Sequence, residues 1–166
     1  MKLRLHRNQR GYSVNEMLVG IATLGVVGTA FLVAFFNMTS SVEKTNAAYL
    51  AIGETSQSST WTFRDVSMAQ STNIADGAPA VSTATFSWNN LYGGTTVARQ
   101  VTYSLNGNQL VRTSETDTSV VAIGIKVLQF SRANKLITVT IQAEPANNRF
   151  KVNDQQSFQI RLRSNG

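Results

Sequence analysis

Glu16 is the residue of this chain whose position most needs a chemical explanation. It stands directly before residues 17–36, a run of twenty residues, MLVGIATLGVVGTAFLVAFF, that only Thr23 and Thr29 interrupt. A run of that length is enough to cross a bilayer as a helix. An ionised carboxylate costs about 2.5 to 3.5 kcal/mol at the centre of such a helix and less near its end. A charge kept at that cost usually has a partner.

A new amino terminus is the partner that the surrounding residues suggest. If the chain is cut between Gly11 and Tyr12, an α-amino group stands four residues before Glu16. With an ordinary pKa of about 7.7 to 8.0, this amine is largely cationic at neutral pH. The Glu16 carboxylate of one molecule can neutralise the amine of a neighbour, because an unpaired charge of either sign is disfavoured in hydrocarbon. Such pairing predicts side-by-side helices displaced along their axes, as in a helical filament.

Basic residues before the apolar run predict its orientation. No acidic residue precedes Glu16, whereas four basic residues do: Lys2, Arg4, Arg7 and Arg10. Loops rich in Lys and Arg stay on the cytoplasmic side of a membrane. We therefore expect a single-pass protein of the inner (cytoplasmic) membrane, with a cytoplasmic leader and an extracytoplasmic domain after Phe36.

Two simpler interpretations compete with this one. A cleaved secretory signal has a shorter apolar region and a small-residue cleavage site of the A-x-A kind. The residues after Phe36 read NMTSSVEK and offer only a poor version of that site. A plain uncleaved anchor accounts for the length and the orientation of the run, but it leaves Glu16 unexplained.

The segment G-Y-S-V-N-E-M-L-V-G, together with the basic leader before it and the apolar helix after it, resembles the signal of type IV prepilins and type II secretion pseudopilins. The resemblance implies that prepilin peptidase cuts after Gly11, that Tyr12 becomes an N-methylated terminus, and that Glu16 is the assembly glutamate. Asn15 departs from the pattern, since the family usually has an apolar residue there. The implied partners are other pilin or pseudopilin subunits, the peptidase, the inner-membrane assembly platform and, before assembly, membrane lipid.

The resemblance also implies an α+β, pilin-like fold, in which a long N-terminal helix, half membrane-spanning and half amphipathic, packs on an antiparallel β-sheet. It divides the chain into a basic leader (1–11), a transmembrane assembly helix (12–36) and an extracytoplasmic domain (37–166). The implied function is that of a non-enzymatic structural subunit of a type IV filament, type II secretion pseudopilus or competence pilus.

The residue inventory argues against catalysis and against a bound cofactor or metal. The chain has no cysteine, and its one histidine, His6, lies in the leader. The mature chain therefore offers no thiolate or His-bearing metal site and no imidazole base. Glu115 and Asp117 form the closest acidic pair, which we interpret as a solvated turn. We expect no catalytic residues, no metal ligands and no cofactor.

A helical pattern without proline follows the membrane run and extends to about residue 69. Apolar residues recur there at near-helical spacing: Val42, Ala47, Tyr49, Leu50, Ile52, Trp61, Phe63, Val66 and Ala69. We expect this face to pack on the sheet, with Arg64 and Asp65 on the solvated side. Gly53 and the SQSST stretch form its weak middle.

Alternation of β-branched and polar residues predicts strands in the rest of the chain, after a loop over residues 71–80. The expected strands cover residues 83–88, 99–105, 109–114, 120–131, 136–143 and 158–163, with a turn at Asn106-Gly107. They imply an antiparallel meander that covers the helix. The stretch VTYSLNGNQLVRT and the later KVLQF resemble minor pilins and pseudopilins of the PilW and GspJ type, which favours a minor subunit, although any hairpin with a favourable turn reads similarly.

Nucleic-acid contact is the alternative function that the sequence leaves open. Basic residues are frequent in the C-terminal third, and the candidates for phosphate contact are Lys126, Arg132, Lys135, Arg161 and Arg163. Trp88 and Tyr92, in or beside a loop, are candidates for stacking on bases, so that the chain would be a binding module at a filament tip that contacts DNA or a surface. The formal charge of +6 gives this alternative little support, because four of the fifteen Lys and Arg residues lie in the leader. A solvated sheet rim explains the same residues more simply.

Overall fold

The computed structural model describes residues 13–92, 95–145 and 150–163, with the backbone alone for residues 91 and 92. The chain forms two compact units, Met1–Val42 and Glu43–Gly166. The single helix α1 (Val14–Met68) contributes to both, and the strands all belong to the second unit. Each unit is described by itself.

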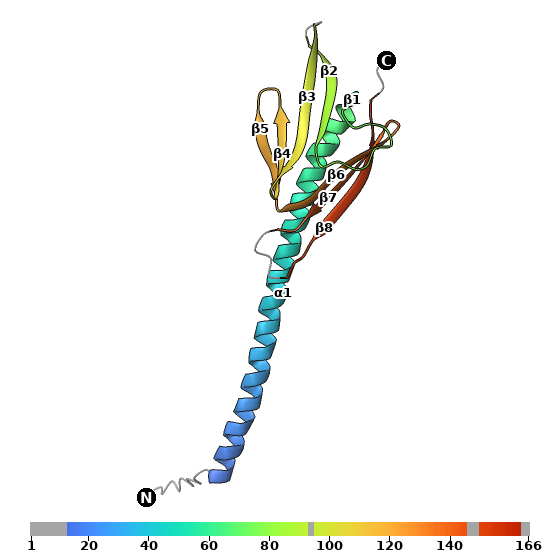
Figure 1. Ribbon diagram of the computed structural model, residues 1–166. Coiled ribbons are helices and arrows are strands. Elements are labelled where there is room, and N and C mark those ends of the chain that lie inside the picture. The colour runs from blue at the N-terminus through green and yellow to red at the C-terminus, as the bar shows by residue number, and fades with distance from the viewer. Residues whose placement is uncertain (1–12, 93–94, 146–149, 164–166) are drawn as a thin grey trace, which may run out of the picture. The chain divides into compact units, whose positions relative to one another are not determined.

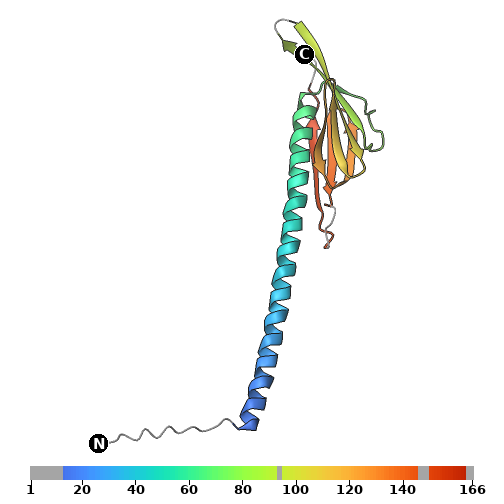
Figure 2. The same cartoon turned by 90° about the vertical axis from the view of Figure 1, so that its left-hand side faces the viewer.

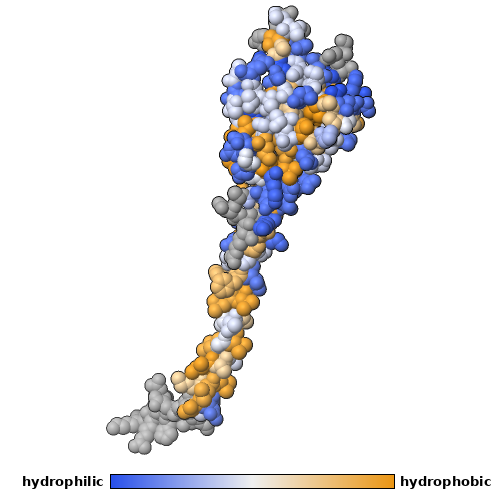
Figure 3. Space-filling view, in the orientation of Figure 1, coloured by the Kyte–Doolittle hydropathy of each residue, from blue (hydrophilic) through white to orange (hydrophobic). Residues whose placement is uncertain are grey.

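In the first unit, α1 is an apolar helix whose large side chains are exposed. Its large apolar residues range from 51% exposed at Val42 to 77% exposed at Val14. Figure 3 shows apolar side chains over most of the visible face of this part of α1. By its length and composition, the helix is long and apolar enough to cross a membrane. The expected apolar helix is therefore present.

The second unit contains two antiparallel sheets (Figure 1). A five-stranded sheet has its strands in chain order: β1 (Ser71–Thr72), β2 (Ala84–Tyr92), β3 (Thr95–Asn106), β4 (Gln109–Ser114) and β5 (Thr118–Ile123). A three-stranded sheet follows: β6 (Ile125–Ala133), β7 (Leu136–Ala143) and β8 (Asp154–Arg161). The α+β layout of helix and antiparallel sheets agrees with the sequence.

The single strand expected over residues 120–131 is wrong, because the chain leaves one sheet and enters the other at Gly124. This glycine has a φ of +78°, in the left-handed region that side chains disfavour. A Cβ atom at this position would lie 2.9 Å from the Cα atom of Pro145. The Gly124 carbonyl accepts a hydrogen bond from the amide of Glu144 at 2.7 Å, which fixes the corner. The strands therefore form two sheets, and not the single meander that the sequence predicted.

The expected turn at Asn106-Gly107 joins β3 to β4 as a tight hairpin. Asn106 pairs with Gln109, so that Gly107 and Asn108 form the loop, and Gly107 has a φ of +61°. A glycine with positive φ at the first loop position suits the twist of the flanking strands. The loop expected over residues 71–80 begins with the two residues of β1, which pair with β2.

The face of α1 that packs on the sheets matches the expected apolar face only in part: Val66 and, just after the helix, Ala69 are buried as expected, but most of the other expected residues are exposed. In the second unit the views of Figures 1 and 2 agree that the later part of α1 lies along the sheets. Its buried residues are mostly small or polar: Ala51, Thr55, Ser58, Thr62, Asp65 and Val66. The hydroxyl groups of Thr55 and Thr62 donate to the carbonyls of Ala51 and Ser58, at 3.0 and 2.7 Å. Hydroxyls satisfied within the helix can be buried, and their small size allows close approach to the strands.

Large apolar side chains of the core come mainly from the strands. Phe86 on β2, Tyr103 on β3 and Phe130 on β6 are fully buried and form a cluster with ring centroids 5.7 to 6.5 Å apart. Aromatic pairs at such separations favour edge-to-face packing. Because β6 belongs to the three-stranded sheet, this cluster joins the two sheets in one core.

Candidate functional site

Glu16 takes part in a capping box at the start of α1. The backbone amide of Ser13 donates to Oε2 of Glu16 at 3.0 Å, and the amide of Glu16 donates to the Ser13 hydroxyl at 3.3 Å. Reciprocal bonds of this kind satisfy two amides that the helix leaves without partners. The S-x-x-E spacing was readable from the sequence, but our sequence analysis missed this role. Gly11 and Tyr12, the predicted processing residues, lie outside the described residues.

The basic residues proposed for phosphate contact divide into two locations. Arg132 and Lys135 lie at the turn between β6 and β7, and Arg161 pairs with Leu136 at the same end of the three-stranded sheet. Lys126 lies at the other end of β6, where its amine forms an ion pair with Glu144. The topology thus brings three of the five candidates to one end.

Arg132 has a structural role beside its charge. Its Nε atom donates to the carbonyl of Asn134 at 2.7 Å, and Nη1 donates to the carbonyl of Ile74 at 3.2 Å. The fifth candidate, Arg163, is exposed, and its amide donates to the carbonyl of Ala69 at 2.8 Å, at the end of α1. The stacking role proposed for Trp88 fails, because Trp88 lies within β2 and is only 8% exposed. The side chain of Tyr92 lies outside the part of the chain that the structure describes.

Asp65 is buried, which corrects the expected solvated position. Its side chain is 2% exposed, and Oδ2 accepts hydrogen bonds from the hydroxyl of Tyr103 at 2.6 Å and from Nε of Arg112 at 2.7 Å. Arg112 lies on β4, and its guanidinium is 5.4 Å from the ring centroid of Trp61. The network connects α1 to two strands. Asp65 lies three residues after Thr62, on the buried polar face, a pattern that an apolar periodicity cannot detect.

Burial and the Asp65 carboxylate shift the pKa values of both partners. Burial raises the pKa of the Tyr103 hydroxyl, and the hydrogen bond to Asp65 raises it further, because both effects disfavour a second anion in the core. The hydrogen bond to Asp65 also raises the pKa of Arg112. The tyrosine is therefore neutral and the arginine charged over the physiological pH range.

An exposed apolar surface runs along the outer side of α1 in the second unit. Tyr49 and Ile52 are 70% and 48% exposed, and Phe63 is 53% exposed although its ring centroid lies 6.4 Å from that of Phe158 on β8. All three belong to the face expected to be buried. Their spacing of three and eleven residues places them along one side of a helix. Monomeric soluble proteins rarely expose large contiguous apolar patches, and such patches are typical of interaction sites.

Comparison with known proteins adds no relative: no family model matches the chain, and neither a curated protein nor a solved structure does. Over the described residues, no group of three or more acidic, histidine or cysteine side chains is arranged to hold a metal ion.

Proposed function

We propose that this chain is a non-enzymatic structural subunit, in a minor role, of a type IV filament, a type II secretion pseudopilus or a competence pilus. In this proposal it is made as a single-pass protein of the inner membrane with an extracytoplasmic domain. Prepilin peptidase removes residues 1–11, and the assembly platform then moves the mature subunit into the filament.

The position of Glu16 carries the proposal. The carboxylate stands in the first turn of α1, immediately before an apolar helix whose large side chains are all more than half exposed. Among the described residues, the carboxylate accepts a hydrogen bond from the Ser13 amide, while the Glu16 amide donates to the Ser13 hydroxyl. These are bonds to neutral groups, so the charge of Glu16 is available to a cationic terminus of another subunit.

The outer surface of α1 in the second unit is a second support. Exposure of Tyr49, Ile52 and Phe63 on one side of a helix is unusual for a protein that stays monomeric in water. Packing against the helices of neighbouring subunits would bury this surface. The same contact would extend the association that begins in the membrane segment.

Processing of the amino terminus tests the class of protein. Mass spectrometry of the membrane-extracted chain should find Tyr12 as the first residue, carrying one additional methyl group. Replacing Gly11 with a bulky residue should block the cut, whereas Gly11→Ala is the tolerated control. An intact Met1 would instead indicate an uncleaved anchor. A terminus beyond Phe36 would indicate an ordinary cleaved secretory signal.

DNA binding at a filament tip stays a second candidate because the topology gathers Arg132, Lys135 and Arg161 at one end of the three-stranded sheet. DNA retention by the full chain in uncharged detergent tests it. Binding to phosphates weakens steeply with salt, and the double variant Arg161→Gln/Arg163→Gln should weaken it at every salt concentration. DNA retention that does not depend on the salt concentration would exclude this function.

A further inference from the structure

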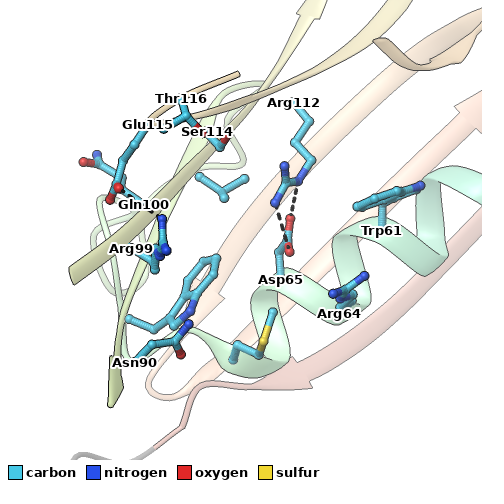
Figure 4. A pocket seen from close by; sticks show the side chains of 13 residues that line it. Trp61, Arg64, Asp65, Asn90, Arg99, Gln100, Arg112, Ser114, Glu115 and Thr116 are labelled. Atoms are coloured by element: carbon cyan, nitrogen blue, oxygen red, sulfur yellow. Dashed lines mark hydrogen bonds and ion pairs between the residues drawn. The ribbon is translucent and has the colours of Figure 1, made fainter. Parts of the chain in front are cut away.

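A cavity of about 390 Å³ lies beside the buried Asp65 network (Figure 4). Its walls come from the end of α1, from β2, β3 and β4, and from the residues after β4. Figure 4 shows Arg99 and Glu115 on one side of the cavity and the Asp65–Arg112 pair with Trp61 on the other. The volume lies within the range of roughly 300 to 1,000 Å³ that is typical of pockets for small organic ligands.

Apolar surface makes up the body of the cavity. Both tryptophans of the chain, Trp61 and Trp88, line it, together with Met68 and Val101. Trp88 and Val101 belong to the buried core and are 8% and 2% exposed. Walls of this kind favour a ligand with an apolar body, because its burial removes apolar surface from water.

The charges around the cavity leave one positive charge in excess. Three arginines line it against two carboxylates, and Arg112 is committed to Asp65 at 2.7 Å. Arg99 and Glu115 form an ion pair at 3.7 Å with both side chains more than 40% exposed, which is a weak interaction that a ligand can replace. Arg64 is held near the Trp61 ring at 5.8 Å, and within the described part of the chain it has no carboxylate at ion-pair distance.

A hydrogen-bond donor in the wall also lacks an acceptor. The Nε1 atom of Trp88 is buried and has no hydrogen-bond partner among the described residues. Buried donors are nearly always paired, so an unpaired one in the wall of a cavity calls for an explanation. An oxygen of a bound molecule could accept this bond after a small movement of the side chains that shield the indole nitrogen.

From these features we propose that the cavity binds an organic monocarboxylate with an apolar body and a carbonyl oxygen, either a free acid or the C-terminal end of a peptide. The carboxylate binds Arg99 in place of Glu115, the apolar body lies against Met68 and Val101, and the carbonyl oxygen accepts from Trp88. One excess positive charge matches a monoanion. A phosphate dianion would face Asp65 and Glu115 without sufficient compensation. The site does not depend on the filament role.

Tryptophan emission gives a direct measurement, since both tryptophans of the chain line the cavity. We would titrate the full-length protein in uncharged detergent micelles with N-acetyl-leucine, which carries all three features. N-acetyl-leucinamide is the matched control that lacks only the charge. The acid should change the emission saturably, and the amide should bind about tenfold more weakly, because a hydrogen-bonded charge contributes more than a neutral group.

Substitutions locate the site. Arg99→Gln should weaken binding of the acid by about tenfold, whereas Arg161→Gln, at a residue of β8 that does not line the cavity, should leave it unchanged. Tighter binding of the tripeptide acid acetyl-Ala-Ala-Leu than of N-acetyl-leucine assigns a peptide end, and equal binding assigns a free acid. The proposal is overturned by equal affinities for acid and amide, by unaltered binding to the Arg99→Gln variant, by tighter binding of inorganic phosphate, or by an unsaturable response.

Discussion

Asp65 on α1 and Arg112 on β4 form an ion pair with 2.7 Å between Oδ2 and Nε, and the Tyr103 hydroxyl donates to the same oxygen. The carboxylate is almost fully buried, so removal of Arg112 leaves a charge without its main partner. We expect Arg112→Leu to lower the free energy of unfolding by about 3 kcal/mol. The double variant Asp65→Leu/Arg112→Leu should recover much of this loss, because it removes both charges. Denaturant unfolding followed by tryptophan emission measures both. A double variant that is no more stable than Arg112→Leu would show that the pair is not coupled.

The raised pKa of Tyr103 predicts a dependence of stability on alkaline pH. In the unfolded chain this tyrosine ionises near its ordinary value of 10.0, whereas in the folded chain it keeps its proton to higher pH. Its contribution to stability is therefore complete below pH 10 and decreases as the pH rises above that value. The slope from this one group approaches about 1.4 kcal/mol per pH unit. Tyr103→Phe should show a shallower decrease between pH 10 and 11, and equal slopes would contradict the assignment.

Gly124→Ala should destabilise the second unit. The new Cβ atom would lie 2.9 Å from the Cα atom of Pro145, and the φ of +78° would be strained for alanine. We expect a loss of about 1 to 3 kcal/mol in the free energy of unfolding.

Gly53→Ala is the matched control for this substitution. Gly53 lies within α1, and an added Cβ atom meets nothing within 4 Å. It should therefore stabilise the helix by about 0.5 to 1 kcal/mol. If Gly124→Ala and Gly53→Ala changed the free energy of unfolding in the same direction, strain at the Gly124 corner would not explain the effect of Gly124→Ala.

The outer surface of α1 can be tested separately from the fold. Tyr49→Ser/Ile52→Ser changes residues that are 70% and 48% exposed, so the free energy of unfolding should change by less than about 0.5 kcal/mol per site. Incorporation into filaments should fall strongly if neighbouring subunits cover this surface. Val120→Ser, at a residue on β5 that is 50% exposed, is the control and should assemble normally. Normal assembly of the helix variant would remove the second support for the proposed function.

Local patterns predicted the elements of this chain better than their arrangement. The apolar run, the strand alternation and the Asn106-Gly107 turn are each short-range signals, and all three correspond to observed elements. The break at Gly124 depends on the approach of Pro145 from beyond β7, a contact that no local window contains. A glycine inside a strand pattern is nevertheless a local signal of a bulge or bend.

The helix face was mispredicted for a different physical reason. Apolar periodicity identifies the side of a helix that water disfavours, and in a lone globular domain that side packs inward. Here Val66 packs inward as expected, but Thr55, Ser58 and Thr62 pack inward in place of most of the other expected residues, and their hydroxyls donate to helix carbonyls. The role of Asp65 follows from Tyr103 and Arg112, which are 38 and 47 residues away in the sequence. Periodicity could not connect these residues.

The capping box at the start of α1 should be separable from the charge of Glu16. Ser13→Ala removes the hydroxyl that accepts from the Glu16 amide, and we expect it to weaken the first turn by about 0.5 to 2 kcal/mol. Amide hydrogen exchange of residues 14–17 in micelles should increase as a result. Filament incorporation should survive, since the carboxylate remains, and its complete loss would assign the assembly role to Ser13 instead.

Filament incorporation of Glu16→Ala and Glu16→Gln, measured against membrane insertion and amino-terminal cleavage in the same cells, tests the central claim most directly. Both variants should insert at least as easily as the natural chain, because they remove a charge that hydrocarbon disfavours. Both should be cleaved normally and yet enter filaments poorly, and cross-links between the Tyr12 and Glu16 positions of different subunits should form only in the natural chain. Cleavage and incorporation of Glu16→Ala at the natural level would show that the carboxylate is not an assembly contact.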